Sequence, residues 1–185
     1  ELDTLIKTLD KHVAMYKKKK EVLKLNIKEL SDIRAWMLFH ILKEYPTRLD
    51  YNHMKLINQR DYNVLKKKNE LTDNYLVSSR GSYKFSFNDY KTSKVYGENV
   101  IEVNKPLKLK LNVYLKLNDY KVGDVIFPIT RNAMSNLLTK TSDKIILRKF
   151  YVSTKYGDIG QDQKKDASMM GHSLISQAVV YNKSN

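Results

Sequence analysis

The apolar residues of this chain change their spacing near residue 74, and no other feature of the sequence constrains the fold as strongly. Residues 2–16 and 30–42 carry apolar side chains three and four positions apart, which is the spacing of one helix face. Residues 75–79 and 82–87 are β-rich and alternate, and Gly81 between them is typical of a hairpin turn. Helices before paired strands, with helices again after them, predict an α+β fold.

The expected elements divide the 185 residues into three parts of a single domain. Residues 1–45 contain the N-terminal helices, 74–103 a small antiparallel three-stranded sheet, and 106–185 a helical C-terminal part. Ser31 is the expected cap of the second helix, and Pro46 ends that helix. A domain of this length buries roughly two-thirds of its unfolded surface, so it is able to hold a real core.

Other stretches need separate interpretation. Residues 48–57 carry Leu49, Met54 and Leu56 and are expected to form a short helix. Residues 107–117 alternate like a strand, whereas Pro106 at a first helical position also permits a helix. The residues alone leave both open. The third strand of the sheet is expected at 99–103, and further helices at 132–140, 143–156, 162–170 and 174–183.

Positive charge dominates the composition. Lys and Arg total 34 against 20 Asp and Glu, which gives a formal net charge of +14. Such an excess suits a polyanion, because cationic side chains displace condensed counterions from phosphates, although a lysine-rich surface that only keeps the chain soluble is the alternative. Arginine is scarce and suits sites that need a planar bidentate fork. The arginines are Arg34, Arg48, Arg60, Arg80, Arg131 and Arg148.

Several function classes are excluded by what the sequence lacks. There is no cysteine, so disulfides, thiolate zinc sites and a cysteine nucleophile are ruled out. The sequence contains no Gly-rich phosphate loop, no His-Glu-x-x-His and no calcium loop, so neither a cofactor nor a metal is expected. No apolar run approaches a membrane span or a signal segment, which predicts an intracellular protein without a membrane partner. Because the chain opens at Glu1, it is expected to be a fragment of a longer protein.

Five residues carry the functional signal, in the order Arg48, Lys91, Arg148, His172 and Tyr181. Tyr181 follows His172 by nine positions, inside a Met-Gly-His-Ser-Leu-Ile-Ser-Gln-Ala-Val-Val-Tyr segment. The order and the interval resemble the catalytic residues of the tyrosine recombinase (integrase) family, and the resemblance spans Arg48 to Tyr181. The Arg-Leu-Asp-Tyr context of Arg48 is most similar to integrases of large DNA viruses and their mobile elements.

These residue types suit phosphodiester cleavage without a metal. The Tyr181 phenolate is the nucleophile and becomes a phosphotyrosyl ester. Arg48, Arg148 and His172 stabilise the charge that grows on the non-bridging oxygens. The resemblance assigns Lys91 the role of general acid toward the departing 5′ oxygen. The covalent bond retains the energy for rejoining, so no nucleotide is required.

The resemblance implies a site-specific recombinase that acts on double-stranded DNA as a tetramer across two synapsed sites, and a monomer in the absence of DNA is compatible with it. If the source is viral, the location is the cytoplasm or nucleus of the host cell. The resemblance favours a helix over 106–117. It also implies a separate N-terminal DNA-gripping domain, to which nothing in residues 1–45 corresponds.

Two of these assignments have a competing interpretation, and one further position departs from the family pattern. Lys94 rivals Lys91 as the general acid, and Arg48 has Asp50 and Glu44 as candidate partners in a purely structural ion pair. Position 145, three residues before the second arginine, commonly holds His or Lys in the family but is Ile145 here.

Two other functions remain open. A type IB topoisomerase uses the same five residue types but relaxes supercoils as a single molecule. A catalytically inactive basic DNA-binding domain is favoured by Ile145, which neither donates nor accepts a proton.

Overall fold

The computed structural model describes residues 2–45 and 47–142. Along this part of the chain the elements are α1 (Leu2–Lys20), α2 (Ile27–Glu44), β1 (Lys55–Asn58), α3 (Gln59–Lys67), β2 (Tyr75–Ser79), β3 (Ser82–Phe87), α4 (Ser93–Tyr96), β4 (Asn99–Glu102), α5 (Lys105–Leu117) and α6 (Arg131–Ser142). This order confirms the α+β class. The helices expected at 143–156, 162–170 and 174–183 lie outside the described residues.

Helix α2 begins earlier than the sequence analysis expected. Asn26 accepts a hydrogen bond from the Glu29 backbone N–H at 2.9 Å, and the Glu29 carboxylate accepts one from the Asn26 N–H at 2.8 Å. This reciprocal capping box satisfies two of the free N–H groups that every helix start exposes. Ser31 therefore lies inside α2, and its expected role as the cap is wrong.

The sheet has four strands rather than three. Its order is β1-β2-β3-β4, and β2, β3 and β4 are antiparallel neighbours as expected. Strand β1, however, pairs parallel to β2, so the sheet is mixed and begins at Lys55 rather than near residue 74. The helix expected over 48–57 is wrong because Leu56 and Ile57 are both buried on opposite faces of the sheet, a placement that a strand provides for neighbouring residues.

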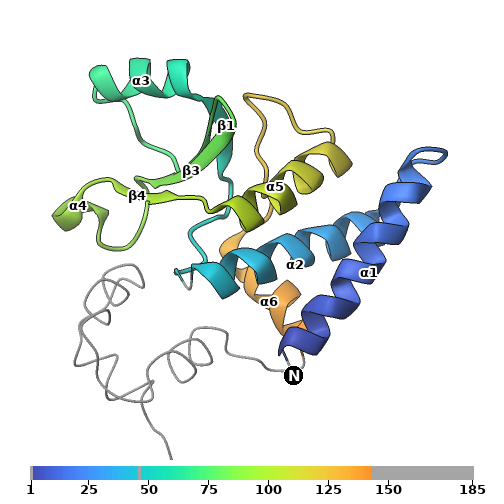
Figure 1. Ribbon diagram of the computed structural model, residues 1–185. Coiled ribbons are helices and arrows are strands. Elements are labelled where there is room, and N and C mark those ends of the chain that lie inside the picture. Colours follow the sequence, from blue (N-terminus) through green and yellow to red (C-terminus); the bar gives the residue numbers. More distant parts are fainter. Residues whose placement is uncertain (1, 46, 143–185) are drawn as a thin grey trace, which may run out of the picture.

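Both faces of the sheet are covered (Figure 1). One face packs on the main core with α2 and α5, and the other packs on α3 through Tyr62. In the main-core face, side chains directly opposite one another form a continuous apolar row across all four strands. The row consists of Leu56, Leu76, Phe85 and Ile101, all of them buried.

The outer edge of β1 is closed by the chain between α5 and α6. Gly123 N donates to Leu56 O at 2.7 Å, and Ile126 N donates to Met54 O at 2.8 Å. The Tyr114 hydroxyl of α5 donates to Ile126 O at 2.6 Å and fastens the same segment from the core side. These bonds protect an otherwise unpaired strand edge and bring the start of α6 back to the residues that precede β1.

Helix α5 decides the ambiguity that the sequence left between 106 and 117. Asn104 caps it by accepting from Leu107 N at 2.9 Å, Pro106 occupies its first turn, and Leu111 and Tyr114 lie in the core. The expected helix is therefore confirmed. In residues 2–45 and 47–142, no helix combines the length and apolar character needed to cross a membrane.

The capping box predicts a difference between two substitutions in α2. Asn26→Ala removes the side chain that accepts from Glu29 N, and we expect the free energy of unfolding to fall by about 1 kcal/mol. Ser31→Ala removes no cap and replaces serine by a better helix former, so stability should stay within about 0.5 kcal/mol. Urea unfolding of both variants measures this, and equal losses would contradict the placement of the cap.

Candidate functional site

Arg48 lies in a tightly held turn between α2 and β1. Thr47 donates through its hydroxyl to the Tyr51 hydroxyl at 2.6 Å, and both side chains are buried. The Tyr51 ring makes edge-to-face contacts with Phe85 and Phe87 of β3, and complete burial raises its pKa far above the usual value. Arg48 itself is half-buried on this rigid support.

Lys91 and Lys94 lie on the connection between β3 and β4, residues 88–98. Both lysines are exposed, and Lys94 belongs to the single turn of α4. The Tyr90 hydroxyl donates to Gly97 O at 2.8 Å and closes the connection on itself. Gly97 has a φ of 68°, a left-handed conformation that glycine adopts without strain. The lysines are thus presented at the tip of a closed β3–β4 hairpin.

The side chain of Asn74 joins these two segments. Its Nδ2 donates to Asp50 O at 2.7 Å and to Asp89 O at 2.8 Å, so two chain segments meet at one nitrogen atom. Asp50 is two residues from Arg48, and Asp89 is two residues from Lys91. The structure therefore brings together the segments that carry Arg48 and Lys91.

A second arginine reaches the same turn from α6. Arg131, the first residue of α6, places Nη2 3.2 Å from the Asp50 carboxylate, and its side chain remains half exposed. The Asp50 carboxylate is largely buried, so this ion pair compensates a charge that is costly to bury alone. Arg131 adds a cation beside the Arg48 turn that the functional pattern in the sequence did not include.

The other end of the β3–β4 connection is anchored by Glu98. Its carboxylate accepts hydrogen bonds from the Tyr62 hydroxyl and from Ser86 Oγ at 2.6 Å, and it pairs with Lys66 of α3 at 2.7 Å. Burial by itself would raise the pKa of Glu98, but the hydrogen bonds from Lys66, Ser86 and Tyr62 lower that pKa below its usual value. Lys84 lies over the Tyr62 ring, with Nζ 4.4 Å from its centroid.

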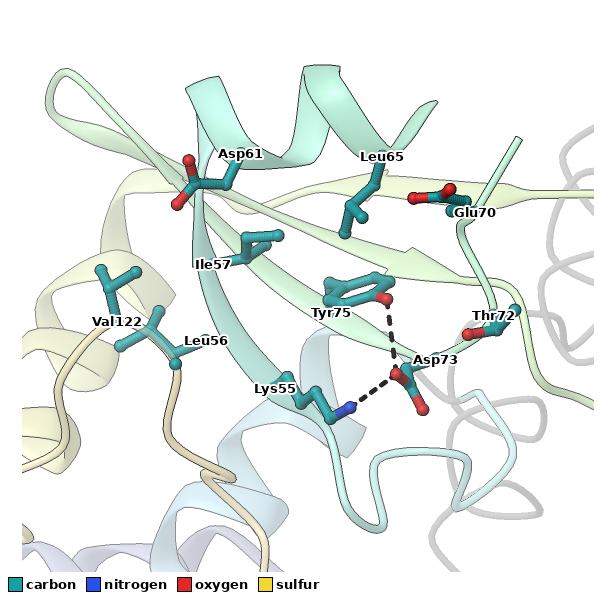
Figure 2. A pocket seen from close by; sticks show the side chains of 11 residues that line it. Lys55, Leu56, Ile57, Asp61, Leu65, Glu70, Thr72, Asp73, Tyr75 and Val122 are labelled. Atoms are coloured by element: carbon teal, nitrogen blue, oxygen red, sulfur yellow. Dashed lines mark hydrogen bonds and ion pairs between the residues drawn. The ribbon is translucent and has the colours of Figure 1, made fainter. Parts of the chain in front are cut away.

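A pocket of about 460 Å³ lies between α3, β1 and the turn at Val122 (Figure 2). Asp61, Glu70 and Asp73 line it, and Lys55 pairs with Asp73 at 2.7 Å. This surplus of carboxylates opposes a phosphate, so the pocket is unsuited to nucleic acid. Among the residues that the structure describes, no group of three His, Cys, Asp or Glu side chains is arranged to hold a metal ion.

Arg148, His172 and Tyr181, together with Ile145, lie outside the described residues. Of the five expected catalytic residues, the structure therefore places Arg48 and Lys91. No protein-family model, curated protein or solved structure matches the chain.

Three residues of this region were missed as site residues by sequence reasoning. Asn74 and Glu98 are ordinary polar residues beside strands, and only their tertiary partners reveal that they hold the lysine-bearing connection. Arg131 is marked in the sequence by the scarcity of arginine alone. No periodicity or spacing connects it with Asp50, which lies 81 positions earlier (131 − 50).

The anchor at Glu98 predicts a pH-dependent stability. Glu98→Gln keeps the size of the side chain but removes its charge, and we expect the free energy of unfolding at pH 7 to fall by about 2 kcal/mol. Because folding lowers the pKa of Glu98, this contribution is present above the unfolded pKa of about 4.3 and disappears as the pH falls through the folded value. The difference between wild type and variant should therefore shrink below about pH 4.

Urea unfolding at pH 7 and at successively lower pH measures this difference. Glu102→Gln is the matched control, because Glu102 is exposed on strand β4, four residues after Glu98. A Glu98→Gln deficit that stays constant as the pH falls would contradict the anchoring role.

Proposed function

We propose that this chain is the catalytic part of a site-specific DNA recombinase or integrase that cleaves and rejoins strands through a covalent 3′-phosphotyrosyl intermediate. The observation that carries the proposal is the ordered set Arg48, Lys91, Arg148, His172 and Tyr181, in which the tyrosine follows the histidine by nine positions. The similarity to the integrases of viral and other mobile elements rests on the same residues.

The described geometry supports this proposal for the first two residues of the set, Arg48 and Lys91. Arg48 stands on a rigid, aromatic-packed turn, and the Lys91 connection is fastened to the same turn through Asn74. Cleavage requires that the arginine and the general acid both reach the same scissile phosphate. The placement of Arg131 beside Asp50 provides a third cation suited to a neighbouring phosphate.

In the proposed reaction, the Tyr181 phenolate oxygen, already deprotonated, attacks the phosphorus and the bond from phosphorus to the 5′ oxygen breaks. Lys91 gives its proton to that departing oxygen, which leaves as a 5′ hydroxyl. Arg48, Arg148 and His172 donate to the non-bridging oxygens, where negative charge is greatest in the transition state. Rejoining reverses these steps with the 5′ hydroxyl of another strand as the nucleophile.

Double-stranded DNA is the proposed partner, bound mainly through its phosphates. The net charge of +14 supplies the electrostatic attraction, and a tetramer on two synapsed sites is the proposed assembly. An acidic pocket on the α3 side, by contrast, leaves that region unattractive to DNA.

Two alternative functions have specific support. The same five residue types serve a type IB topoisomerase, which would relax supercoiled plasmid as a single molecule without a preferred site. Ile145 favours an inactive DNA-binding domain, which would bind DNA and never form a covalent adduct. Formation of an SDS-resistant adduct in the absence of metal separates the enzymes from the inactive domain, and strand exchange between two sites separates the recombinase from the topoisomerase.

The nucleophile is tested by removing one oxygen atom. Tyr181→Phe deletes the phenolic hydroxyl with almost no change in volume, so we expect the adduct with nicked duplex DNA to disappear while DNA binding persists. Denaturing gel electrophoresis detects the adduct, and mass spectrometry locates the modified tyrosine. Tyr96→Phe, at an exposed tyrosine of α4, is the matched control and should retain the adduct. DNA attached to any tyrosine other than Tyr181 would refute the assignment.

The role of Arg131 is tested by salt dependence. If Arg131 contacts a phosphate, Arg131→Ala should weaken binding about equally for all sequences and reduce the slope of log affinity against log salt by about one. Lys67→Ala is the charge-matched control, because Lys67 is exposed on α3. Fluorescence anisotropy across a salt series measures both slopes. A slope unchanged in Arg131→Ala would leave Arg131 as a structural partner of Asp50.

A further inference from the structure

We infer that Asn74 is a positioning residue that holds the proposed general acid Lys91 in register with Arg48 on the same phosphate. This inference rests on the proposed function. It concerns a residue that does not touch DNA and acts through the two chain segments that it joins.

The Asn74 amide uses its full hydrogen-bonding capacity in this junction. Nδ2 donates to Asp50 O and Asp89 O, and Oδ1 accepts from Asn88 N and Asp89 N, both at 2.8 Å. A primary amide has two N–H donors and two lone pairs, so all four are occupied. With 7% of the residue exposed, water has little access to replace any of these bonds.

Neighbouring contacts make the junction stiff. The Asn88 side chain donates to Asp73 O at 2.9 Å and to Ser86 Oγ at 3.0 Å, so the first residue of the connection is tied to β3 and to the segment that leads into β2. Asn74 itself directly precedes β2, and its carbonyl accepts from Lys55 N at 3.0 Å. The β3–β4 connection therefore leaves the sheet from a fixed point that also holds the Arg48 turn.

The proposed chemistry needs such a fixed point. Lys91 has to reach the 5′ oxygen while Arg48 contacts non-bridging oxygens of the same phosphate, and a displacement of about 1 Å can cost about 10²-fold in rate. Lysine has a long flexible side chain on an exposed connection, so its reach depends on where the backbone begins. Glu98 fastens the opposite end of that connection to α3, whereas Asn74 fastens it to the Arg48 turn.

Two DNA substrates distinguish a misplaced acid from a generally damaged site. One carries the ordinary 5′ oxygen at the scissile linkage, and the other carries sulfur at that bridging position. A thiol has a pKa near 8.5 and leaves without receiving a proton, so loss of the general acid no longer matters for the sulfur substrate. The probe is a pool of nicked duplexes in which the scissile linkage has a fixed position and the base sequence on both sides of it is random. Wild-type protein selects the members of this pool with which it forms an adduct.

The key variant is Asn74→Asp. It keeps the oxygen that accepts from Asn88 N and Asp89 N, but it replaces the nitrogen that donates to Asp50 O and Asp89 O by a carboxylate oxygen, so both donor bonds are lost. We expect adduct formation to slow about 100-fold on the oxygen substrate and to stay within about threefold of wild type on the sulfur substrate. Lys91→Ala should show the same pattern, whereas Arg48→Ala should be slow on both substrates.

Asn118→Ala is the control for loss of a structural asparagine, since Asn118 Nδ2 donates to Tyr114 O at 2.9 Å at the end of α5. It should match wild type on both substrates. Circular dichroism checks folding, and Asn74→Ala, which removes the same donor without burying a charge, carries the test if Asn74→Asp does not fold.

The outcomes separate the two proposals. Equal slowing of Asn74→Asp on both substrates, or no slowing on either, would overturn the positioning role while leaving the recombinase proposal intact. A wild-type protein that forms no adduct with any member of either pool would overturn both.

Discussion

The burial of one apolar row across the sheet is the constraint on which the rest of this structure depends. Leu56, Leu76, Phe85 and Ile101 stand opposite one another on the four strands and close against α2 and α5. A small sheet has too little surface to be stable alone, so burial of both its faces is what makes it a platform. The turn with Arg48 and the connection with Lys91 both leave from this platform.

Buried polar side chains fix the loops in place. The apolar core brings these loops close to one another, but it does not hold them in one arrangement. A buried amide, carboxylate or hydroxyl is costly unless it is paired, which gives each such group one well-defined arrangement. Asn74 joins the Arg48 turn to the β3–β4 connection, Asp50 receives Arg131 from α6, and Glu98 joins the same connection to α3. The loops that carry the cations are thus held by buried polar groups whose hydrogen bonds and ion pairs are formed.

In the described part of the chain, the cations around the Arg48 turn and the carboxylate-lined pocket belong to different elements. Arg48, Lys91, Lys94 and Arg131 belong to the turn, the β3–β4 connection and the start of α6, whereas the carboxylate-lined pocket lies between α3 and β1. For the proposed chemistry this separation matters, because electrostatic stabilisation of a phosphorane-like state requires donors without nearby unpaired carboxylates. The buried Asp50 meets that requirement through its pairing with Arg131.

The spacing of apolar residues in the sequence was sufficient to predict α1, α2, the β2–β3 hairpin, β4 and α6. In these elements the residues that become buried recur at the period of a helix or a strand. The sequence also supplied the order of the candidate catalytic residues, which is a property of the chain alone. Strand β1 was misread as helix, because its four residues are too few to show a period and its partners come from β2 and from residues 123–126. The roles of Asn74 and Arg131 were not predictable from the sequence either, because they too depend on distant partners. Their roles are set by hydrogen bonds and ion pairs between residues far apart in sequence, and only the packing of the sheet against the helices brings those partners within reach.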